Sequence, residues 1–392
     1  MSDQHFSPLN ENIDSRPSRP GRQIIGAFTY YNSPDIPTLN DLSIIEGTSS
    51  DNKTYFLPVT NLRSLPAPLS SYTHEKHGFQ ILRQDLPFTP SPEVVHNQKI
   101  MATQYYPSMT AILKKALGAR CAIVRKHSLR DMPDWAAIGM NPEIGFEIES
   151  LAPFSIAHSD YTPAGARGHF RAMKEPDWFL ENNHEDGCTT AAEREEFFRL
   201  RREIIDAEDY AIAKAGINPE VQVGENGEKP RGSHWDWDGR NYDGPRYAFF
   251  SIWRAWETVK RDPLAVMDMS QPVSQRIEYA PLTRTYQDRP GCVPFYYSQN
   301  ALIRPLGRAR RDSGYAGDSD GNVGSNPAWC YLSEQTPEEV YLLKFYDSEA
   351  LVRKGKGKDE IQIMCPHTAF QIAGQEKEPV RRSCELRVWC IW

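Results

Sequence analysis

The sequence lacks paired cysteines, an excess of basic charge and long apolar runs, and each absence excludes a class of protein. The seven cysteines among 392 residues are dispersed and include no Cys-x-x-Cys pair, which argues against a disulfide framework and against structural zinc. With 45 basic and 52 acidic residues, the net charge of -7 provides no basic field for nucleic acid or for an anionic membrane. No apolar run approaches the length of a membrane span. We therefore expect a soluble protein without a polymeric partner.

The N-terminal segment differs in composition from the rest of the chain. Residues 1–22 are polar and rich in Ser, Pro and Asn, without the apolar centre of a secretory signal. They predict a disordered tail and a cytoplasmic location. We expect residues 23–392 to form a single domain, and the charged, loop-like stretch 170–245 to be a helical insertion in it. The sequence leaves the oligomeric state open, with a homodimer among the alternatives.

One strong helix is predicted inside this insertion. Thr190 followed by Glu193 is a capping-box pattern, which satisfies two backbone donors at the start of a helix. Phe198, Ile205 and Ile212 repeat on one helical face. Gly216 is suited to the residue after the end of the helix. A second, shorter helix is predicted between residues 105 and 118.

The remaining signals are typical of β-strands and indicate the fold class. Five short apolar, β-compatible segments are separated by loops rich in Gly, Asp and Ser. These segments are Ile144–Ile156, Tyr247–Trp253, Glu339–Tyr346, Ile361–Met364 and Cys384–Ile391. Several strands with one helical insertion predict a mainly β fold with peripheral helices, a double-stranded β-helix or cupin-like jelly roll.

A His-x-Asp motif is the first indication of chemistry. Two side chains two residues apart on an extended backbone project to the same side, which suits two ligands of one metal ion. The motif is short and matches by chance, and here it occurs three times, beginning at His158, His184 and His234. His158 and Asp160 directly follow an apolar segment, so we predict that this pair binds the metal. His184 lies in a polar loop.

A third ligand has to come from another strand. His367 follows the predicted strand 361–364 and meets this condition, and fourteen residues later Arg381 is followed by Ser383. A guanidinium can hold a carboxylate with two parallel hydrogen bonds, and a hydroxyl two residues along the same strand points the same way. His158, Asp160 and His367 then form a two-histidine, one-carboxylate iron site with coordination positions left open for oxygen and an organic ligand.

These motifs occur in an order that resembles a known family, the gibberellin-desaturase-like and cephamycin-methoxylation-like nonheme iron oxygenases of secondary metabolism. The resemblance runs from about residue 25 to the end of the chain. The segments that carry it are Lys76–Phe79, Ala157–Thr162 with Gly165–Arg167, Ser251–Arg254 with Asp262–Ala265, Thr336–Val340 with Lys344 and Asp347–Ser348, Pro366–Phe370, and Arg381–Arg387. The chain departs from the family pattern in having Ala255-Trp256 after the Trp-Arg pair and in its long insertion.

The resemblance implies a jelly-roll enzyme that uses Fe(II), 2-oxoglutarate and O2. It makes His158, Asp160 and His367 the iron ligands, and Arg381 with Ser383 the residues that hold 2-oxoglutarate. It also implies decarboxylation of 2-oxoglutarate to succinate, coupled to hydroxylation, desaturation, ring formation or peroxidation of a small-molecule secondary metabolite.

Five further residues are predicted to line the substrate pocket. They are Tyr161, His234, Trp235, Trp253 and Arg254. Their aromatic rings suit an organic substrate, and Arg254 suits an anionic group of either the substrate or the co-substrate.

Two alternatives remain open from the sequence. The first is a cupin-like metal-dependent dioxygenase or isomerase that keeps the three ligands but does not use 2-oxoglutarate. The second is a catalytically silent jelly-roll accessory subunit that retains no iron.

Overall fold

A computed structural model of the chain describes most of the residues that follow the N-terminal tail. The described residues are 24–35, 37, 43–44, 48–131, 150–173, 190–217, 237–272, 274, 277–285, 296–304, 328–357 and 361–392. The predicted tail, the loop centred on His184 and the pair His234 and Trp235 lie outside these residues.

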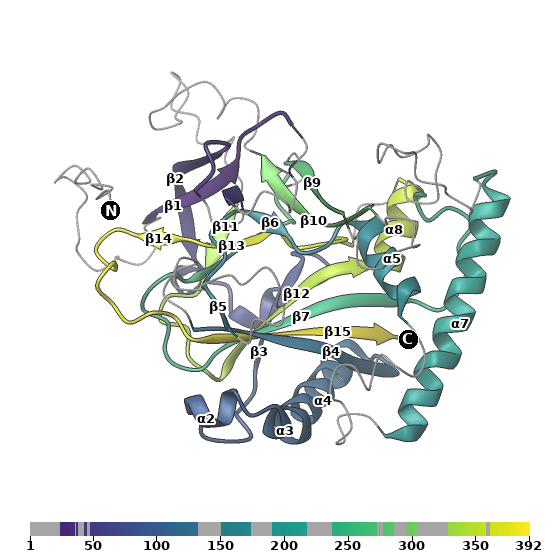
Figure 1. The fold of residues 1–392 in the computed structure, drawn as a ribbon, viewed down its shortest axis with the longest axis horizontal. Coiled ribbons are helices and arrows are strands. Elements are labelled where there is room, and N and C mark those ends of the chain that lie inside the picture. Colours follow the sequence, from purple (N-terminus) through teal and green to yellow (C-terminus); the bar gives the residue numbers. More distant parts are fainter. Residues whose placement is uncertain are drawn as a thin grey trace.

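Two β-sheets form the framework (Figure 1). The larger sheet has the order β14 (Gln371–Ile372), β1 (Ile24–Tyr31), β2 (Asn52–Asn61), β11 (Trp329–Tyr331), β8 (Leu264–Met267), β13 (His367–Ala369), β6 (His158–Ser159), β10 (Tyr296–Arg304) and β9 (Glu278–Thr285). The smaller sheet has the order β3 (Phe79–Arg83), β12 (Glu339–Asp347), β7 (Tyr247–Ala255), β15 (Ser383–Ile391), β4 (Cys121–Arg130) and β5 (Ser150–Leu151). The sequence prediction of a mainly β jelly roll is confirmed.

Alternation along the strands of the smaller sheet separates two apolar layers. On β7, Phe249 and Trp253 point into the core between the sheets, where they meet residues of the larger sheet such as Leu264 and Val266. The intervening residues, such as Phe250, point to the opposite face. Because successive side chains of a strand face opposite ways, a shift of one residue moves a side chain from one layer to the other.

Short helices cover the outer face of the smaller sheet. They are α2 (Pro92–Val95), α3 (Gln98–Ile100), a π-helical turn (Met101–Tyr105) and α4 (Tyr106–Leu117). In Figure 1 they lie below β4 and β15. Pro107 occupies the first turn of α4, and Gly118 follows the helix with a φ of 66°. Such a left-handed conformation favours glycine, and the predicted helix is confirmed.

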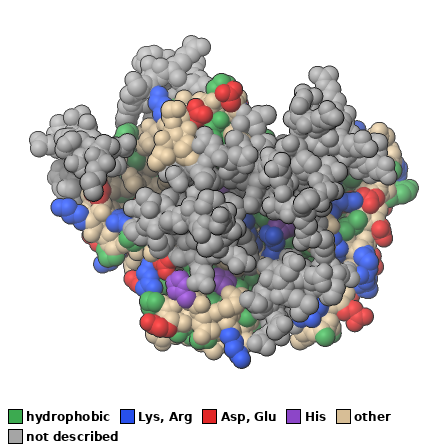
Figure 2. Space-filling view, viewed as in Figure 1, with side chains coloured by type: hydrophobic (Ala, Val, Ile, Leu, Met, Phe, Trp, Pro, Cys, Tyr) green, Lys and Arg blue, Asp and Glu red, His purple; other side chains and the backbone are tan. Residues whose placement is uncertain are grey.

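The long helix α7 (Ala191–Lys214) is the described core of the predicted insertion. Thr190 and Glu193 form the expected capping box. The buried face is centred on Phe197, Ile204 and Glu208, one residue away from the predicted repeat, so Ile205 is only partly buried. Basic and acidic side chains alternate along the right edge of Figure 2, where Figure 1 places α7.

A buried ion-pair network joins α7 to α5 (Pro163–Ala172) and to the smaller sheet. Glu208 is almost fully buried, and its carboxylate accepts hydrogen bonds from Nε of Arg167 at 3.2 Å and from Nη1 of Arg171 at 3.0 Å. The hydroxyl of Tyr247 on β7 donates a third. A buried carboxylate is tolerated only with such partners, so Glu208 determines how the helix docks.

The structure tests two strand predictions near the candidate ligands. Residues 361–364 form no strand, because this segment makes isolated backbone hydrogen bonds rather than a ladder. The next residue, Cys365, also makes an isolated bond, from its backbone N–H to the carbonyl of Lys344 at 2.7 Å. The strand is β13, which begins at His367 itself. In the predicted segment 144–156, residues 144–149 lie outside the described residues, the short β5 and a bridge from Ile156 to Thr29 are present, and His158 itself begins β6.

The described residues also test the predictions about membrane spans and cysteines. No helix in the described ranges is long and apolar enough to cross a membrane. Five of the seven cysteines lie in these ranges, and all five are buried free thiols. They are Cys121, Cys330, Cys365, Cys384 and Cys390.

The Glu208 network predicts that two substitutions on α7 lower the free energy of unfolding by different amounts. Glu208→Ala leaves the Arg167 guanidinium buried without its carboxylate, and we expect it to lower the free energy of unfolding by about 3–5 kcal/mol. Glu203→Ala removes an exposed carboxylate that pairs with Arg199, and we expect a loss below about 1 kcal/mol. Urea unfolding measures both, and equal losses would contradict the docking role of Glu208.

Candidate metal centre

Three candidate ligands meet where β6 and β13 pair. His158 on β6 and His367 on β13 are direct cross-strand partners, so their rings lie side by side with centroids 4.4 Å apart. Asp160 follows β6 and projects to the same side as His158. One ligand atom from each of the three lies within 4.8 Å of the others, and all three residues are buried. The structure therefore brings together the residues predicted as the iron site.

Backbone carbonyls determine the tautomer of both histidines. Nδ1 of His158 lies 2.8 Å from the carbonyl oxygen of Ile156, and Nδ1 of His367 lies 3.1 Å from that of Cys365. A carbonyl oxygen only accepts, so each Nδ1 carries the proton and each Nε2 keeps its lone pair. These two nitrogens lie 3.4 Å and 3.9 Å from the carboxylate oxygens of Asp160. Two free imidazole nitrogens and a carboxylate fit one divalent transition-metal ion.

Electrostatics hold two of the ligands, His367 and Asp160, in protonation states that suit metal binding. Burial, followed by the neighbouring His158, lowers the pKa of His367 to about 3, so its imidazole is neutral at pH 7. Burial alone would raise the pKa of Asp160. The guanidinium of Arg387 and the two histidines outweigh burial and hold that pKa well below its usual value. The site thus presents a neutral imidazole at His367 and an ionised carboxylate at Asp160.

A row of charged side chains on β15 supports the ligands. Arg387 contacts Asp160, with Nη2 3.3 Å from the carboxylate, and its Nε lies 3.2 Å from Glu385. Glu385 also faces Arg130 of β4 at 3.6 Å. The sequence analysis assigned no role to these three supporting residues. The sequence pattern that could have indicated Glu385 and Arg387 is the alternation Arg381, Ser383, Glu385, Arg387, which places four polar groups on one face of an extended segment.

The predicted carboxylate-binding pair lies on the same face. Arg381 and Ser383 are both buried. Nη1 of Arg381 donates to the carbonyl of Asp262 at 2.6 Å, and the guanidinium lies over the ring of Trp253 at 5.0 Å. Nε of Arg381 and the hydroxyl of Ser383 have no hydrogen-bond partner. Buried polar groups are rarely left unpaired, so both atoms indicate a missing ligand. Burial, followed by the nearby Arg130, lowers the pKa of Arg381 to about 9.

One cavity joins the histidines to this arginine. It is partly open, has a volume of about 310 Å³ including the solvent at its mouth, and is lined by His158, His367 and Arg381 together. Its other walls are formed by Arg130, Phe154, Trp253, Leu264, Leu343, Thr368, Ala369 and Glu385. The two metal-ligand histidines and the unpaired arginine therefore face one shared cavity.

The residues predicted to line the substrate pocket lie in different places in the structure. Trp253 lines the cavity. Tyr161 is fully buried and packs against Phe345 instead, with its hydroxyl 3.2 Å from Nδ1 of His169. Arg254 is not brought to the site, because it follows Trp253 on β7 and so points to the opposite face of the sheet. His234 lies outside the described residues, as does Trp235.

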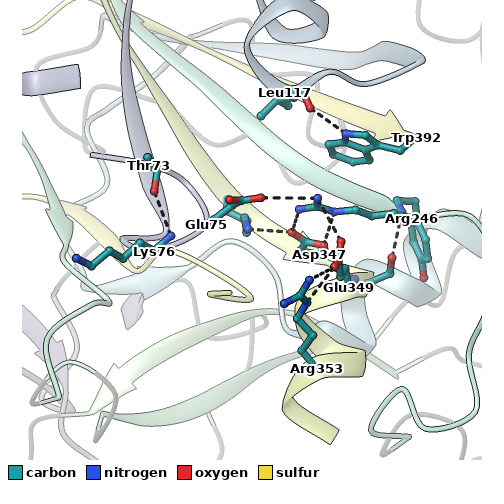
Figure 3. A network of polar contacts seen from close by, with 12 residues as sticks. Thr73, Glu75, Lys76, Leu117, Arg246, Asp347, Glu349, Arg353 and Trp392 are labelled. Carbon is teal, nitrogen blue, oxygen red and sulfur yellow. Dashed lines mark hydrogen bonds and ion pairs between the residues drawn. The ribbon is translucent and has the colours of Figure 1, made fainter. Parts of the chain in front are cut away.

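A second, more open pocket at the far end of β7 has a different character. Arg246 lies between Asp347 and Glu349, at 2.7 Å and 3.3 Å, while Arg353 pairs with Glu349 at 2.7 Å (Figure 3). The guanidinium of Arg246 also covers the ring of Trp392. Its arginines are thus already paired with carboxylates, and the arrangement joins the ends of β7, β12 and β15 rather than offering a binding group.

Comparisons with known proteins agree with the fold and the site. The family model for the oxidoreductase/YMDC permease-like domain matches residues 29–181 and 315–391, together more than half of the chain. Two relatives, both 26% identical, are the oxidoreductase chry3 of Gibberella zeae, with 94% of this chain and 98% of the relative covered, and the gibberellin cluster GA4 desaturase of Gibberella fujikuroi, with 98% and 100% covered.

A solved structure extends the comparison to the whole fold. The iron and alpha-ketoglutarate-dependent endoperoxidase NvfI superposes with a TM-score of 0.51 over 94% of this chain and 98% of its own, at 15% identity. That identity supports a shared fold alone. The resemblance to gibberellin-desaturase-like oxygenases is confirmed, and the chain belongs to the oxidoreductase/YMDC permease-like domain family.

Proposed function

We propose that this protein is an Fe(II)- and 2-oxoglutarate-dependent dioxygenase that oxidises a small-molecule secondary metabolite. The observation that carries the proposal is the cavity that is lined by His158 and His367 at one place and by Arg381 at another. Neither group alone is specific, since buried histidines and buried arginines both occur in structural roles. Their sharing of one small cavity supports a metal ion and a dicarboxylate bound side by side.

The three ligands would hold the iron ion on one side and leave its other side facing the cavity. His158, His367 and Asp160 provide two nitrogen donors and one oxygen donor, the donor set of nonheme Fe(II) oxygenases. When bound, the iron ion would supply the activation of O2 and of the 2-oxo acid. Arg387 restrains Asp160 by its contact at 3.3 Å, so that the carboxylate stays ionised and oriented.

The charge balance favours an anionic co-substrate. Among the described residues, three guanidinium groups, those of Arg130, Arg381 and Arg387, face two carboxylates, Asp160 and Glu385, while the nearby Asp262 is paired with Arg261. The site therefore has an excess positive charge even before a metal cation binds. Nε of Arg381 would donate to the remote carboxylate of 2-oxoglutarate, and the Ser383 hydroxyl would donate beside it.

Part of the cavity wall suits a carbon skeleton. Phe154, Leu264 and Leu343 contribute apolar surface to it. The relatives include desaturases and a hydroxylase/desaturase, asaB, of Aspergillus flavus. We infer that this protein likewise attacks a C–H bond of its substrate, with hydroxylation, desaturation, ring formation or peroxidation as the outcome.

Iron binding should depend on the two strand-paired histidines. His158→Ala or His367→Ala removes one of three donors, and we expect each to lower the affinity for Fe(II) by at least about a hundredfold. Anaerobic equilibrium dialysis followed by metal analysis measures the affinity. His169→Ala is the matched control, because His169 is equally buried and is not a ligand. Retention of iron by both ligand variants would favour a structural role for the histidines.

Co-substrate binding should depend on Arg381 and not on its neighbour. Anaerobic addition of 2-oxoglutarate to the Fe(II) protein should give the visible charge-transfer band of a chelated 2-oxo acid. Loss of a charged hydrogen bond predicts that Arg381→Gln raises the dissociation constant for 2-oxoglutarate by about 10–100-fold while iron affinity is kept. Arg382→Gln should change little, because Arg382 faces outward and pairs with the exposed Glu257.

The same titration separates the proposal from its alternatives. An iron-loaded protein that gives no band in the presence of 2-oxoglutarate would indicate a cupin-like enzyme that does not use this co-substrate. A protein that retains no iron would indicate an accessory subunit. Equal effects of Arg381→Gln and Arg382→Gln would contradict the assignment of the clamp.

A further inference from the structure

Arg254 is a fully buried arginine on the face of β7 that is turned away from the candidate metal centre. Its side chain reaches the layer of short helices and makes one hydrogen bond, from Nη2 to the carbonyl of Gln84 at 2.8 Å. Nε and Nη1 have no hydrogen-bond partner. Two of its three nitrogens are thus left as unsatisfied donors in the protein interior.

The surroundings place no carboxylate in direct contact with this guanidinium. Its cross-strand neighbours are Val340 on β12 and Cys384 on β15, neither of which is a strong acceptor. Glu338 and Asp85 are the nearest acidic groups in electrostatic terms, but both reach solvent. No carboxylate in the described part of the chain forms an ion pair with Arg254. Burial accordingly lowers the pKa of Arg254.

Two more unsatisfied donors lie beside it. The Tyr105 hydroxyl and the Trp256 indole nitrogen are buried and also have no partner. Tyr105 packs against both other residues, with Cζ of Arg254 5.7 Å and the ring centroid of Trp256 5.3 Å from its own ring centroid. Phe88 closes the cluster over these two rings.

The local backbone is unusual at the same place. Tyr105 is the last residue of the π-helical turn Met101–Tyr105, directly before α4. π-Helical turns are rare and are frequently found at functional sites. Here the turn brings a phenol hydroxyl to the buried arginine from a second element, so the cluster is built from β7, the residue after it and the helical layer.

Four buried donors and a positive charge without a carboxylate in contact favour an acceptor that carries negative charge. Unsatisfied buried donors destabilise a folded protein, and water could meet the hydrogen bonds but not the charge. The enclosure by aromatic rings excludes a bulky anion. We propose that Arg254, Tyr105 and Trp256 form a buried binding site for a small inorganic anion, chloride in solution, that stabilises the contact between the helical layer and the sheet.

This site is independent of the proposed chemistry. Trp253 lines the metal cavity, whereas Arg254, the next residue, faces the opposite layer, so the anion would not touch the co-substrate. Occupancy would therefore appear in stability and not in iron or 2-oxoglutarate binding.

Thermal unfolding of the full-length, iron-free chain tests the proposal. Sodium chloride from 10 to about 300 mM is compared with sodium gluconate at equal ionic strength, so that general screening is the same in both series. An anion that binds only the folded state raises the midpoint, and for a chain of this size we expect about 2 °C for each tenfold increase in chloride above its dissociation constant. Identical midpoints in chloride and gluconate would overturn the proposal.

Substitutions locate the effect. Arg254→Gln should abolish the chloride-dependent rise, and Trp256→Phe, which keeps an aromatic ring and loses the indole N–H, should reduce it. The latter also serves if Arg254→Gln does not fold. Arg201→Gln is the matched control, because Arg201 is also buried but donates to the carbonyls of Phe170 and Arg171, and it should retain the full rise.

A structural readout complements the stability measurement. Crystals grown in sodium bromide should show an anomalous peak within hydrogen-bond distance of Arg254 Nε or Nη1. A chloride-dependent rise that persists in Arg254→Gln, or a water molecule in place of the anomalous peak, would place the stabilising anion elsewhere and refute the site.

Discussion

The pairing of β6 with β13 is the constraint on which the candidate centre depends. Each is a very short strand in the middle of the larger sheet, and His158 and His367 occupy the same register position in it. Because the hydrogen-bond ladder determines which residues are opposite, two segments far apart in the sequence present their imidazoles at one point. Asp160 directly follows β6, and this position brings its carboxylate to the two imidazoles. The carbonyls of Ile156 and Cys365 determine the tautomers of the histidines. The ligand set is therefore a property of sheet register rather than of a flexible loop.

Because side chains alternate along each strand, the two faces of the smaller sheet have different surroundings: one faces the candidate metal centre and the other faces the helical layer. On β15, Ser383, Glu385 and Arg387 face the centre, while Cys384 and Leu386 face the helical layer. On β7, Trp253 supports Arg381 from the inner face, whereas Arg254 is buried on the outer face. On the inner face, the charges of Arg387, Glu385 and Arg130 are paired with carboxylates or guanidinium groups of the site, whereas Nε of Arg381 has no partner and is available to a ligand. On the outer face, Lys344 is paired with Asp347, whereas Arg254 contacts no carboxylate in the described part of the chain, which suggests a second, structural anion.

Much of this arrangement could be predicted from local patterns, and the failures have physical causes. The capping box at Thr190 and the proline-to-glycine pattern of α4 are signals within single elements, and both were confirmed. The predicted strand 361–364 was wrong, because an apolar run also suits a segment tied down by isolated contacts. Arg254 was placed in the pocket because sequence gives adjacency to Trp253 but not which face each residue occupies. Arg387 was missed as a partner of Asp160, since that contact joins β15 to the residue after β6 and no local pattern encodes it.

A crystal structure of the anaerobic complex with Fe(II) and 2-oxoglutarate tests the central claim most directly. The account predicts one metal ion held by His158, Asp160 and His367, with 2-oxoglutarate in the same cavity and its remote carboxylate on Arg381 and Ser383. It also predicts that Nε of Arg381, unpaired without a ligand, becomes a donor to that carboxylate. A metal bound elsewhere, or 2-oxoglutarate bound away from Arg381, would contradict the account.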